Sequence, residues 1–556
     1  MIAAPPIARR ARLAWRTVRQ LRAGQVVNRV WRVLWRPAAV SGASLAPRAA
    51  RRAWRDAPAR RSEWLDPTSV TLLGETGRVR EPADWQHAFD TDLRLYHLHY
   101  LDQLCAGVQP AEGFPAMLFE RWVKENPPGS RPGWDPYPTS RRLVNALKAV
   151  LAGMPLSHSA LTSLADQCRY LVPRVEFHLL GNHLLANAKA LMFAGAWFSG
   201  AEAEAWLGRG SRVLAREVPE QVLADGGHVE RSPMYHAIVT EDLLDLVNLR
   251  DCYALPALEY LDDACTKMLT WYGAVRHTDG GIPLINDSAL DVAMSFATLE
   301  AYARRLGLAV PGTAPPGLTL LRASGYGRIA IGPWCLLLDV GSVGPAYQPG
   351  HAHAGTLSYE LSVGPERIVV DTGVSTYRQD EVRARERSTA AHNTVTLDAV
   401  NSSQVWGSFR VADRAQVTRL SGDQTPQGAW VSATHDGYSR SRYRALHTRR
   451  WHVSTQAVDI EDTVHGSGAP ATETAVHFHP HCAVRTLDDR RISVATPSGA
   501  RLLLSLDETL TWHCDSYLYA PTFGVRTPAT VLRGRTSSPL PRSVRMRFEV
   551  SAPARP

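Results

Sequence analysis

The pattern of apolar residues changes at one place in the chain, and that change limits the folds open to it. Before Val310, long apolar segments separated by Pro, Gly and Ser turns are typical of helices. After Gly317, the apolar runs are short and alternate with polar residues, as in antiparallel strands. We therefore predict an α+β multidomain protein, with a helical domain over residues 64–310 and an antiparallel β-sandwich over 318–556. A ligand site is expected where the two domains meet.

The individual elements follow from these periodicities. Helices are predicted at 140–151, 159–171, 178–198, 201–217, 237–247 and 289–306. Strands are predicted at 334–339, 356–363, 367–371, 392–397, 458–463, 474–479, 501–506 and 544–550. The segment 178–198 is apolar enough to suggest a membrane span, but His178, Asn182, His183, Asn187 and Lys189 would be costly in lipid. We interpret it as a buried inner helix.

The positive charge of the chain is concentrated at its start. Residues 1–61 hold fifteen Arg, no Lys and one acid, a charge of +14; since the whole chain carries +9, the remainder carries −5. Residues 1–63 are predicted to be a basic helix, over 9–36, and a linker. The helix either lies on an anionic membrane surface or docks on the protein with its arginines in water. The mildly acidic remainder does not favour nucleic-acid binding.

Two further features bear on where the protein works. No apolar h-region follows the N-terminal charges, so a secretory signal peptide is not expected. The seven cysteines are scattered and form no CxxC pair, which argues against a zinc ribbon or a disulfide framework and fits a reducing compartment. We expect the cytoplasm or the inner-membrane periphery, and the periplasm less so.

A cluster of histidines stands in the predicted sandwich. His351 and His353 are two residues apart, so on a strand both would face one pocket. Asp371 ends the strand predicted at 367–371, and His392 precedes the next apolar run. Imidazoles and a carboxylate at strand ends are ligands for a divalent metal, with one imidazole left as acid or base. The alternative is that these histidines serve only in structural hydrogen bonds.

Three stretches of the helical domain offer further polar groups. Asn182 and Asn187 are amides in an otherwise apolar helix, where they bind a ligand or cross-link neighbouring helices. Residues 225–236 form a Gly-rich turn that ends in several functional side chains, and residues 134–141 combine aromatics with arginine. Candidate substrate-binding residues from these stretches are Trp134, Tyr137, Arg141, Glu230, Arg231 and His236.

These motifs together resemble the heparinase II/III family of polysaccharide lyases. The helical half is represented by Trp134-Asp135-Pro136-Tyr137, Gly181-Asn182-His183 and Glu230-Arg231-Ser232-Pro233-Met234-Tyr235-His236. The β half is represented by His351-Ala352-His353, Val370-Asp371-Thr372-Gly373 and Arg387-Ser388-Thr389-Ala390-Ala391-His392-Asn393. The resemblance implies an incomplete (α/α) toroid followed by an antiparallel β-sandwich. It also implies cleavage of an acidic, uronate-containing polysaccharide, glycosaminoglycan-like or alginate-like, by β-elimination.

The resemblance also implies roles for individual residues. Asn182, with His183, would neutralise the uronate carboxylate; Tyr235 and His351 would act as base and acid; Arg387 would join the substrate-binding set. His353, Asp371 and His392 would hold a divalent metal, zinc first and manganese or calcium otherwise. Many relatives carry Asp two residues after the second histidine, where this chain has Gly355. This departure from the family bears on metal occupancy and substrate preference more than on the fold.

The chemistry calls for these residue types independently. Elimination removes a proton beside a carboxylate, which requires donors that stabilise the developing enolate-like oxygen. A tyrosine or histidine must take that proton, and another must protonate the leaving oxygen. Tyr235 would need a cation such as His236 or Arg231 nearby to act as a phenolate. The alternatives are a non-catalytic glycan-binding or exopolysaccharide-assembly protein, and a glycoside hydrolase using carboxylates such as Asp225, Glu230, Asp279 or Asp287.

Overall fold

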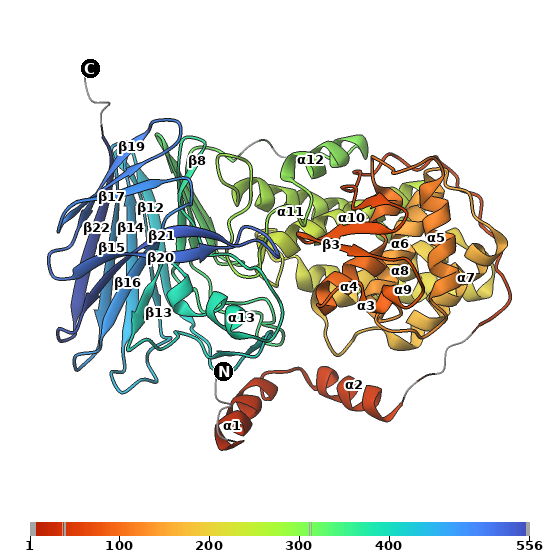
Figure 1. Cartoon of the computed structure of the whole chain (residues 1–556), viewed down its shortest axis with the longest axis horizontal. Helices are drawn as coiled ribbons and strands as arrows, with labels where there is room; N and C mark the ends of the chain where they lie inside the picture. The colour runs from red at the N-terminus through yellow and green to blue at the C-terminus, as the bar shows by residue number, and fades with distance from the viewer. Residues whose placement is uncertain (1–6, 36, 38–40, 311, 313, 552–556) are drawn as a thin grey trace.

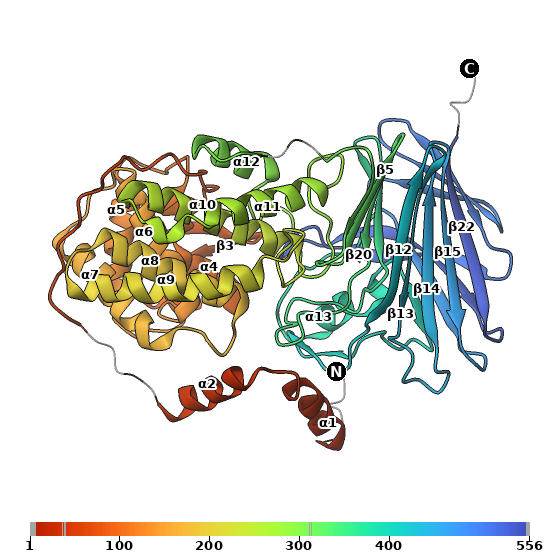
Figure 2. The same ribbon diagram turned by 180° about the vertical axis from the view of Figure 1, so that it is seen from behind.

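The computed structural model describes residues 7–35, 37, 41–310, 312 and 314–551. Helices and sheets are segregated into two bodies that lie side by side, with two N-terminal helices along one side (Figures 1 and 2). The last helix of the helical body ends at Arg305, and the first strand of the sandwich begins at Gly317. The predicted order of a helical domain followed by an antiparallel β-domain is confirmed.

The helical domain is built from helices of very different exposure. Its helices are α3 (Asp84–His87), α4 (Asp92–Tyr100), α5 (Phe114–Glu125), α6 (Pro136–Leu151), α7 (His158–Leu171), α8 (Gly181–Trp197), α9 (Ala201–Gln221), α10 (Pro233–Tyr253), α11 (Leu261–Ala274) and α12 (Phe296–Arg305). Helix α8 is buried along its length, except at His183, which confirms the prediction of an inner helix. Ser157, Ser232 and Ser295 cap α7, α10 and α12 by accepting a backbone N–H in the first turn.

Short elements complete the helical domain. They are the 3-10 turns η1 (Asp102–Cys105), η2 (Val172–Arg174) and η3 (Pro256–Leu258), and a three-stranded sheet of β1 (Trp64–Asp66), β2 (Ser69–Leu72) and β3 (Glu75–Arg78). This sheet is not among the elements predicted from the sequence. Its strands have only three or four residues, too few for a periodic signal.

The sandwich consists of antiparallel sheets around a shared apolar core. An eight-stranded sheet runs β12-β13-β14-β15-β22-β19-β18-β17, a five-stranded sheet runs β4 to β8, and a four-stranded sheet runs β20-β21-β16-β9. Trp334, Ile460 and Phe548, from three different strands, are buried in one core cluster. Alternating side chains fill this core because successive residues of a strand point to opposite faces.

The strand bounds agree well with the predicted runs. Strands 334–339 and 501–506 have the predicted limits. The strands are β4 (Gly317–Leu321), β5 (Tyr326–Ile331), β6 (Trp334–Asp339), β7 (Tyr359–Val363), β8 (Glu366–Val369), β9 (Val395–Leu397), β10 (Val405–Trp406), β11 (Arg410–Val411), β12 (Val417–Thr425), β13 (Gly428–His435), β14 (Leu446–Val453), β15 (Ala457–His465), β16 (Thr472–His477), β17 (Ala483–Asp488), β18 (Arg491–Ala495), β19 (Arg501–Leu506), β20 (Thr511–Tyr519), β21 (Thr527–Thr536) and β22 (Arg542–Val550). A helix α13 (Glu381–Glu386) and a turn η4 (Thr389–Ala391) interrupt them.

His351 and His353 do not lie on a strand, although their spacing suggested that both imidazoles would share one strand face. Both lie in the long connection between β6 and β7, outside any strand. Nearby Pro345 and Pro349 lack the backbone N–H that a strand ladder needs, and the connection carries functional side chains instead.

The N-terminal segment also departs from its prediction. Instead of one helix over 9–36, it forms α1 (Ile7–Val18) and α2 (Ala23–Leu34). The break falls at Arg22, whose backbone is extended and whose N–H is bonded by the Gln25 side chain, 3.0 Å away. The predicted linker is irregular where described and follows the helical domain, with the Arg48 N–H bonded to the Trp197 carbonyl. Among the described residues, every helix is too short or too polar to span a bilayer.

Gly373 sets the turn that follows Asp371. Its φ of +74° disfavours a side chain, and an added Cβ would lie 2.0 Å from the Ala520 carbonyl oxygen. Gly364 has a φ of +55° but open space around it. We expect Gly364→Ala to lower the free energy of unfolding by about 1 kcal/mol, and Gly373→Ala to cost roughly 1–3 kcal/mol more through the backbone clash. Denaturant unfolding measures both; equal losses would contradict the packing described for Gly373.

Candidate active site

The carboxylate of Asp287 joins the two domains. It lies between α11 and α12, and it is fully buried. His351 Nδ1 lies 2.9 Å from Oδ2, and His353 Nε2 lies 2.7 Å from Oδ1. Arg383 of α13 donates to both oxygens, at 2.5 and 2.7 Å. Burial opposes ionisation, but the Arg383 guanidinium and the two imidazoles hold the pKa of Asp287 well below its ordinary value. The carboxylate therefore fixes both histidines from the helical side.

Tyr235 and His351 face one another across the domain interface. Their rings are stacked, with centroids 3.8 Å apart and an interplanar angle of 26°. The Tyr235 hydroxyl lies 3.3 Å from the Tyr377 hydroxyl, a contact that the sequence did not indicate. Burial, and then Tyr377, raise the pKa of Tyr235 well above its ordinary value. The phenol is therefore protonated at neutral pH and suited to donate a proton.

The cations expected beside Tyr235 lie elsewhere. His236 Nε2 faces the Met268 carbonyl at 2.9 Å, and burial lowers the pKa of His236 to about 3. The Arg231 guanidinium crosses to the carbonyl of Ser342 in the sandwich. The expectation that either residue makes Tyr235 a phenolate is therefore not met.

Asn182, at the start of α8, is held by Glu230. Its backbone N–H donates to Glu230 Oε1 at 2.8 Å, and its Nδ2 donates to both oxygens at 3.0 and 2.8 Å. Glu230 Oε2 also lies 3.4 Å from His351 Nε2. Against the effect of burial, His351, His228 and Asn182 lower the pKa of Glu230. Gly181 allows this approach, because a Cβ there would lie 2.0 Å from Glu230 Oε1. The Asn182 amide, which was predicted to bind the substrate carboxylate, is thus already hydrogen-bonded to a carboxylate of the protein.

His183 is the accessible donor at this site. It is the one residue of α8 that is not buried. Its Nδ1 lies 3.2 Å from Glu176 Oε2, and its ring lies on that of Tyr137, with centroids 4.4 Å apart. Burial lowers the pKa of His183, but Glu176 raises it by more, so the net shift is upward. His183 therefore favours the imidazolium form, which attracts a carboxylate.

Three of the predicted substrate-binding residues are buried inside the protein. Trp134 is buried, and its indole N–H donates to the Asn126 carbonyl at 3.1 Å. Arg387 is buried and donates to the carbonyls of Ala352, at 2.8 Å, and Gly407. His236 is fully buried. None of these side chains is free to contact a sugar, although Arg387 fixes the backbone between His351 and His353.

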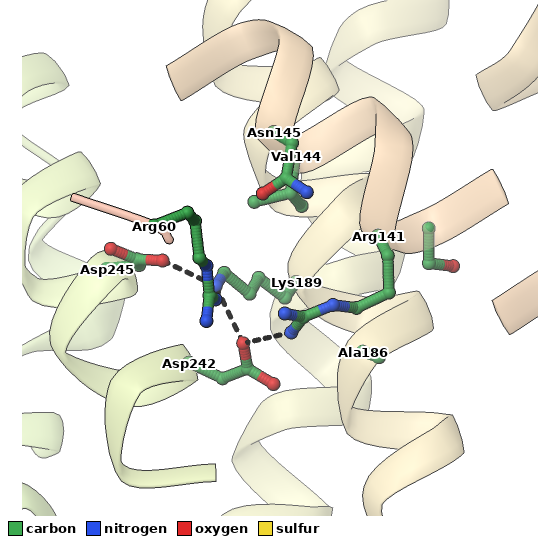
Figure 3. Close-up of a pocket in the computed structure, with 9 residues that line it drawn as sticks. Arg60, Arg141, Val144, Asn145, Ala186, Lys189, Asp242 and Asp245 are labelled. Carbon is green, nitrogen blue, oxygen red and sulfur yellow. Dashed lines mark hydrogen bonds and ion pairs between the residues drawn. The ribbon is translucent and has the colours of Figure 1, made fainter. Parts of the chain in front are cut away.

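Arg141 belongs to a charged cluster inside the helical domain, shown in Figure 3. It faces Asp242 at 3.3 Å, and Lys189 bonds both Asp242 and Asp245 at 2.7 Å. Arg60, from the segment before β1, bonds Glu241 at 2.7 Å. The small cavity that these residues line holds about 10 Å³, enough for one water and not for a sugar. Arg141 is therefore part of an internal ion-pair network.

The predicted metal ligands His353, Asp371 and His392 are neighbours, but their ligand atoms do not all lie within 4.8 Å of one another. His392 Nδ1 lies 2.7 Å from Asp371 Oδ2, and the His353 and His392 ring centroids are 5.4 Å apart. His353 Nδ1 and His392 Nε2 are buried and have no hydrogen-bond partner, which fits imidazoles that bind a cation. A Cβ on Gly355 would lie 3.0 Å from the His392 ring, so the missing aspartate would press on that imidazole.

A different triad has the spacing of a metal site. Among the described residues, only Glu63, His97 and Asp102 form a group of at least three whose ligand atoms all lie within 4.8 Å of one another. Burial is the main reason that the pKa of His97 falls to about 4, and Arg141 and Arg60 lower it further. These two guanidinium groups work against a cation at the triad, so it is a weak alternative to the predicted ligand set.

The carboxylates considered for hydrolysis are all engaged. Asp225 accepts from Ser324 at 2.8 Å, and Asp279 pairs with Arg367 at 2.7 Å. Glu230 and Asp287 are held as described above. A hydrolase needs two carboxyl groups on opposite sides of the bond that it cleaves, whereas the His351 imidazole lies between Glu230 and Asp287.

Comparisons with known proteins agree with this architecture. A family model described as "Heparinase II/III N-terminus" matches residues 116–304, and "Heparinase II/III-like, C-terminal" matches 313–549. The crystal structure of heparinase III superposes with a TM-score of 0.66 at 17% identity, covering 82% of this chain and 76% of that one. The fold is that of a helical toroid joined to a β-sandwich, as predicted. The chain belongs to the heparinase II/III family.

Two curated relatives differ in what their names describe. A heparin-sulfate lyase of Bacteroides stercoris is 29% identical over 184 residues, covering 31% of this chain and 27% of that protein. FtsZ-localized protein C of Caulobacter vibrioides is 24% identical over 374 residues, covering 63% of this chain and 60% of that protein. In both cases the match spans less than two thirds of the relative.

Replacing the central carboxylate tests the junction between the domains. We expect Asp287→Asn to lower the free energy of unfolding by about 3–5 kcal/mol, because it leaves the buried Arg383 without its counter-charge. The control is Asp459→Asn, which makes the same change in an exposed pair with Arg547 and should cost no more than about 1 kcal/mol. Similar losses in denaturant unfolding would contradict the role assigned to Asp287.

Glu386, on the same helix as Arg383, gives a pH-dependent prediction. Its Oε1 accepts from the Ser375 N–H and hydroxyl, and its buried Oε2 has no partner. Burial raises the pKa of Glu386 to about 7. Between the pKa of Glu386 in the unfolded chain and pH 7, Glu386 is protonated in the folded state and ionised in the unfolded state. The free energy of unfolding therefore falls as pH rises through this range. Denaturant unfolding at pH 5 and pH 8 measures this. We expect the free energy of unfolding of Glu386→Gln, relative to that of the wild type, to increase by roughly 2 kcal/mol from pH 5 to pH 8. A difference between the two proteins that does not change with pH would contradict a protonated Glu386.

Proposed function

We propose that the chain is a polysaccharide lyase that cleaves a uronate-containing polysaccharide by β-elimination. One observation carries the proposal: Tyr235 of the helical domain stacks on His351 of the sandwich. His183 and Tyr137, whose rings contact each other, come from the same domain as Tyr235. The protonated phenol of Tyr235 and the imidazole of His351, which are in contact, supply the acid and the base that elimination needs. Glycosaminoglycan-like polymers are the preferred substrate class, since a relative is named a heparin-sulfate lyase; alginate-like polymers are the alternative.

The proposed steps use the groups in place. The His183 imidazolium binds the uronate carboxylate and stabilises the enolate-like oxygen. His351 Nε2 removes the proton beside the carboxylate, a carbon–carbon double bond forms, and the glycosidic carbon–oxygen bond breaks. Tyr235 protonates the leaving oxygen, and solvent exchange then returns both side chains to their starting states. Because Glu230 faces His351 Nε2 and fills the Asn182 amide, the substrate must displace this carboxylate.

We propose that His353, Asp371 and His392 are the residues that hold a divalent metal. The buried, unpartnered His353 Nδ1 and His392 Nε2 support this assignment. When bound, the ion would supply a fixed positive charge that orders the sandwich side of the site. The zinc, manganese or calcium identity follows from the family resemblance alone.

A non-catalytic, glycan-binding role is the second candidate, and one observation favours it. Glu230 satisfies the donors of Asn182 and faces His351, so the carboxylate-binding groups are already matched to an acid of the protein. The similarity to FtsZ-localized protein C, whose name describes no lyase, also supports this candidate.

An elimination assay distinguishes the two functions. We expect the protein to release ultraviolet-absorbing unsaturated uronate ends from at least one member of a panel of glycosaminoglycans and alginate. Tyr235→Phe should reduce this rate by about 10²–10⁴, through loss of the acid. Tyr443→Phe, which removes a hydroxyl bonded to Asp398 elsewhere in the sandwich, should leave the rate unchanged.

Binding without unsaturated product, across the whole panel, would contradict the lyase and favour the second candidate. Full activity in Tyr235→Phe would remove Tyr235 from its assigned role.

A further inference from the structure

The N-terminal helices attach to the protein through their polar side chains. From α1, Arg16 pairs with Asp413, and Thr17 accepts a hydrogen bond from the Trp406 indole at 3.0 Å. From α2, the Gln25 side chain is 2% exposed and donates to the Tyr347 carbonyl at 3.1 Å, and Arg32 donates to the Arg174 carbonyl at 3.0 Å. The two helices, here called the N-terminal arm (residues 7–35), therefore contact both domains, and they lie along the outside of the molecule (Figures 1 and 2).

The apolar side of the arm faces solvent. On α2, Val26, Val27, Val30, Trp31 and Leu34 recur at spacings of three and four residues, so they share one helical face. All five are exposed, Trp31 to 54% and Leu34 to 77%. A helix on a protein surface ordinarily buries such a face and exposes its polar one. Here the arrangement is reversed, so burial against the body does not account for the apolar residues.

Helix α1 shows the same reversal. Ile7, Trp15 and Val18 lie on one side, because their spacings of eight and three residues bring them round the helix to similar angles. They are 90%, 67% and 46% exposed. No residue of α1 is buried. Two consecutive helices thus present apolar faces, with tryptophan on each, away from the protein.

The charge beside these faces is entirely positive. The arm contains no Asp or Glu, and the first acid of the chain is Asp56. Arg9, Arg10 and Arg12 are exposed and form no ion pair with another described residue. Tryptophan and aliphatic side chains on one face, flanked by arginines, are the composition of helices that lie in the headgroup region of anionic membranes. The charge also disfavours a second copy of the arm as the partner, because like charges would meet.

We propose that the N-terminal arm docks the protein on an anionic phospholipid bilayer. Both helices lie in the plane of the membrane surface, their apolar faces enter the headgroup–acyl boundary, and the unpaired arginines bind lipid phosphates. The polar contacts of the arm keep both domains at the membrane. The arm also contacts the connection that carries His351, since Gln25 donates to the carbonyl of Tyr347 in that connection. The inference does not depend on the proposed lyase activity.

Vesicle co-sedimentation of the full chain tests the proposal. We expect binding to vesicles of phosphatidylcholine with phosphatidylglycerol, little binding to phosphatidylcholine alone, and weaker binding at high salt, which screens the arginines. Trp31→Ser with Leu34→Ser should reduce the affinity roughly tenfold or more, because two exposed apolar side chains no longer enter the bilayer. Arg9→Gln, Arg10→Gln and Arg12→Gln together should remove most of the preference for anionic vesicles.

The matched control is Leu65→Ser with Val108→Ser, which removes apolar side chains that are 65% and 71% exposed outside the arm. It should bind vesicles like the wild type. The same affinity in the control and in the Trp31/Leu34 double variant would overturn the proposal. So would a wild-type protein that ignores anionic vesicles but forms a dimer in light scattering that the double variant loses, because the arm would then be a protein interface.

Discussion

The buried carboxylate of Asp287 is the interaction on which the site depends. A lone carboxylate in the protein interior would be strongly destabilising. Here the bidentate Arg383 contact and two imidazoles compensate for the lost hydration. The partners come from the sandwich, whereas Asp287 comes from the helical domain, so the same charge that orients His351 also fixes one domain against the other. Stability and site geometry are therefore coupled at this point.

A second carboxylate determines what the site can do. Glu230 accepts three hydrogen bonds from Asn182 and faces His351. It thereby keeps ordered the groups that we propose to bind a substrate carboxylate. Under the proposed function, the same bonds must break before those groups can act, so displacing Glu230 would lower the affinity of the site for a uronate. A substrate with several charged sugars can supply that cost through contacts elsewhere.

The fold was largely predictable from the sequence because periodicity reports burial directly. The change of pattern at 310–317 located the domain boundary region, and the apolar run through Asn182 and Asn187 identified the inner helix. The meeting of Asn182, Tyr235 and His351 was expected from the family motifs. The contacts of Asp287 with the two histidines were not expected. The bond from Asp287 to His351 joins residues 64 positions apart, and no local sequence pattern indicates it. Trp134 and His236 were wrongly predicted to bind substrate, because an aromatic ring beside a functional motif can equally be buried in the core.

The most direct measurement is a crystal structure of the Tyr235→Phe variant with a bound uronate oligosaccharide. The account predicts one sugar unit that contacts both residue 235 and His351, with its carboxylate at His183 and Asn182 and the Glu230 side chain displaced. An oligosaccharide bound elsewhere, with the bonds between Glu230 and Asn182 intact, would contradict the claim that the two domains act together on one sugar.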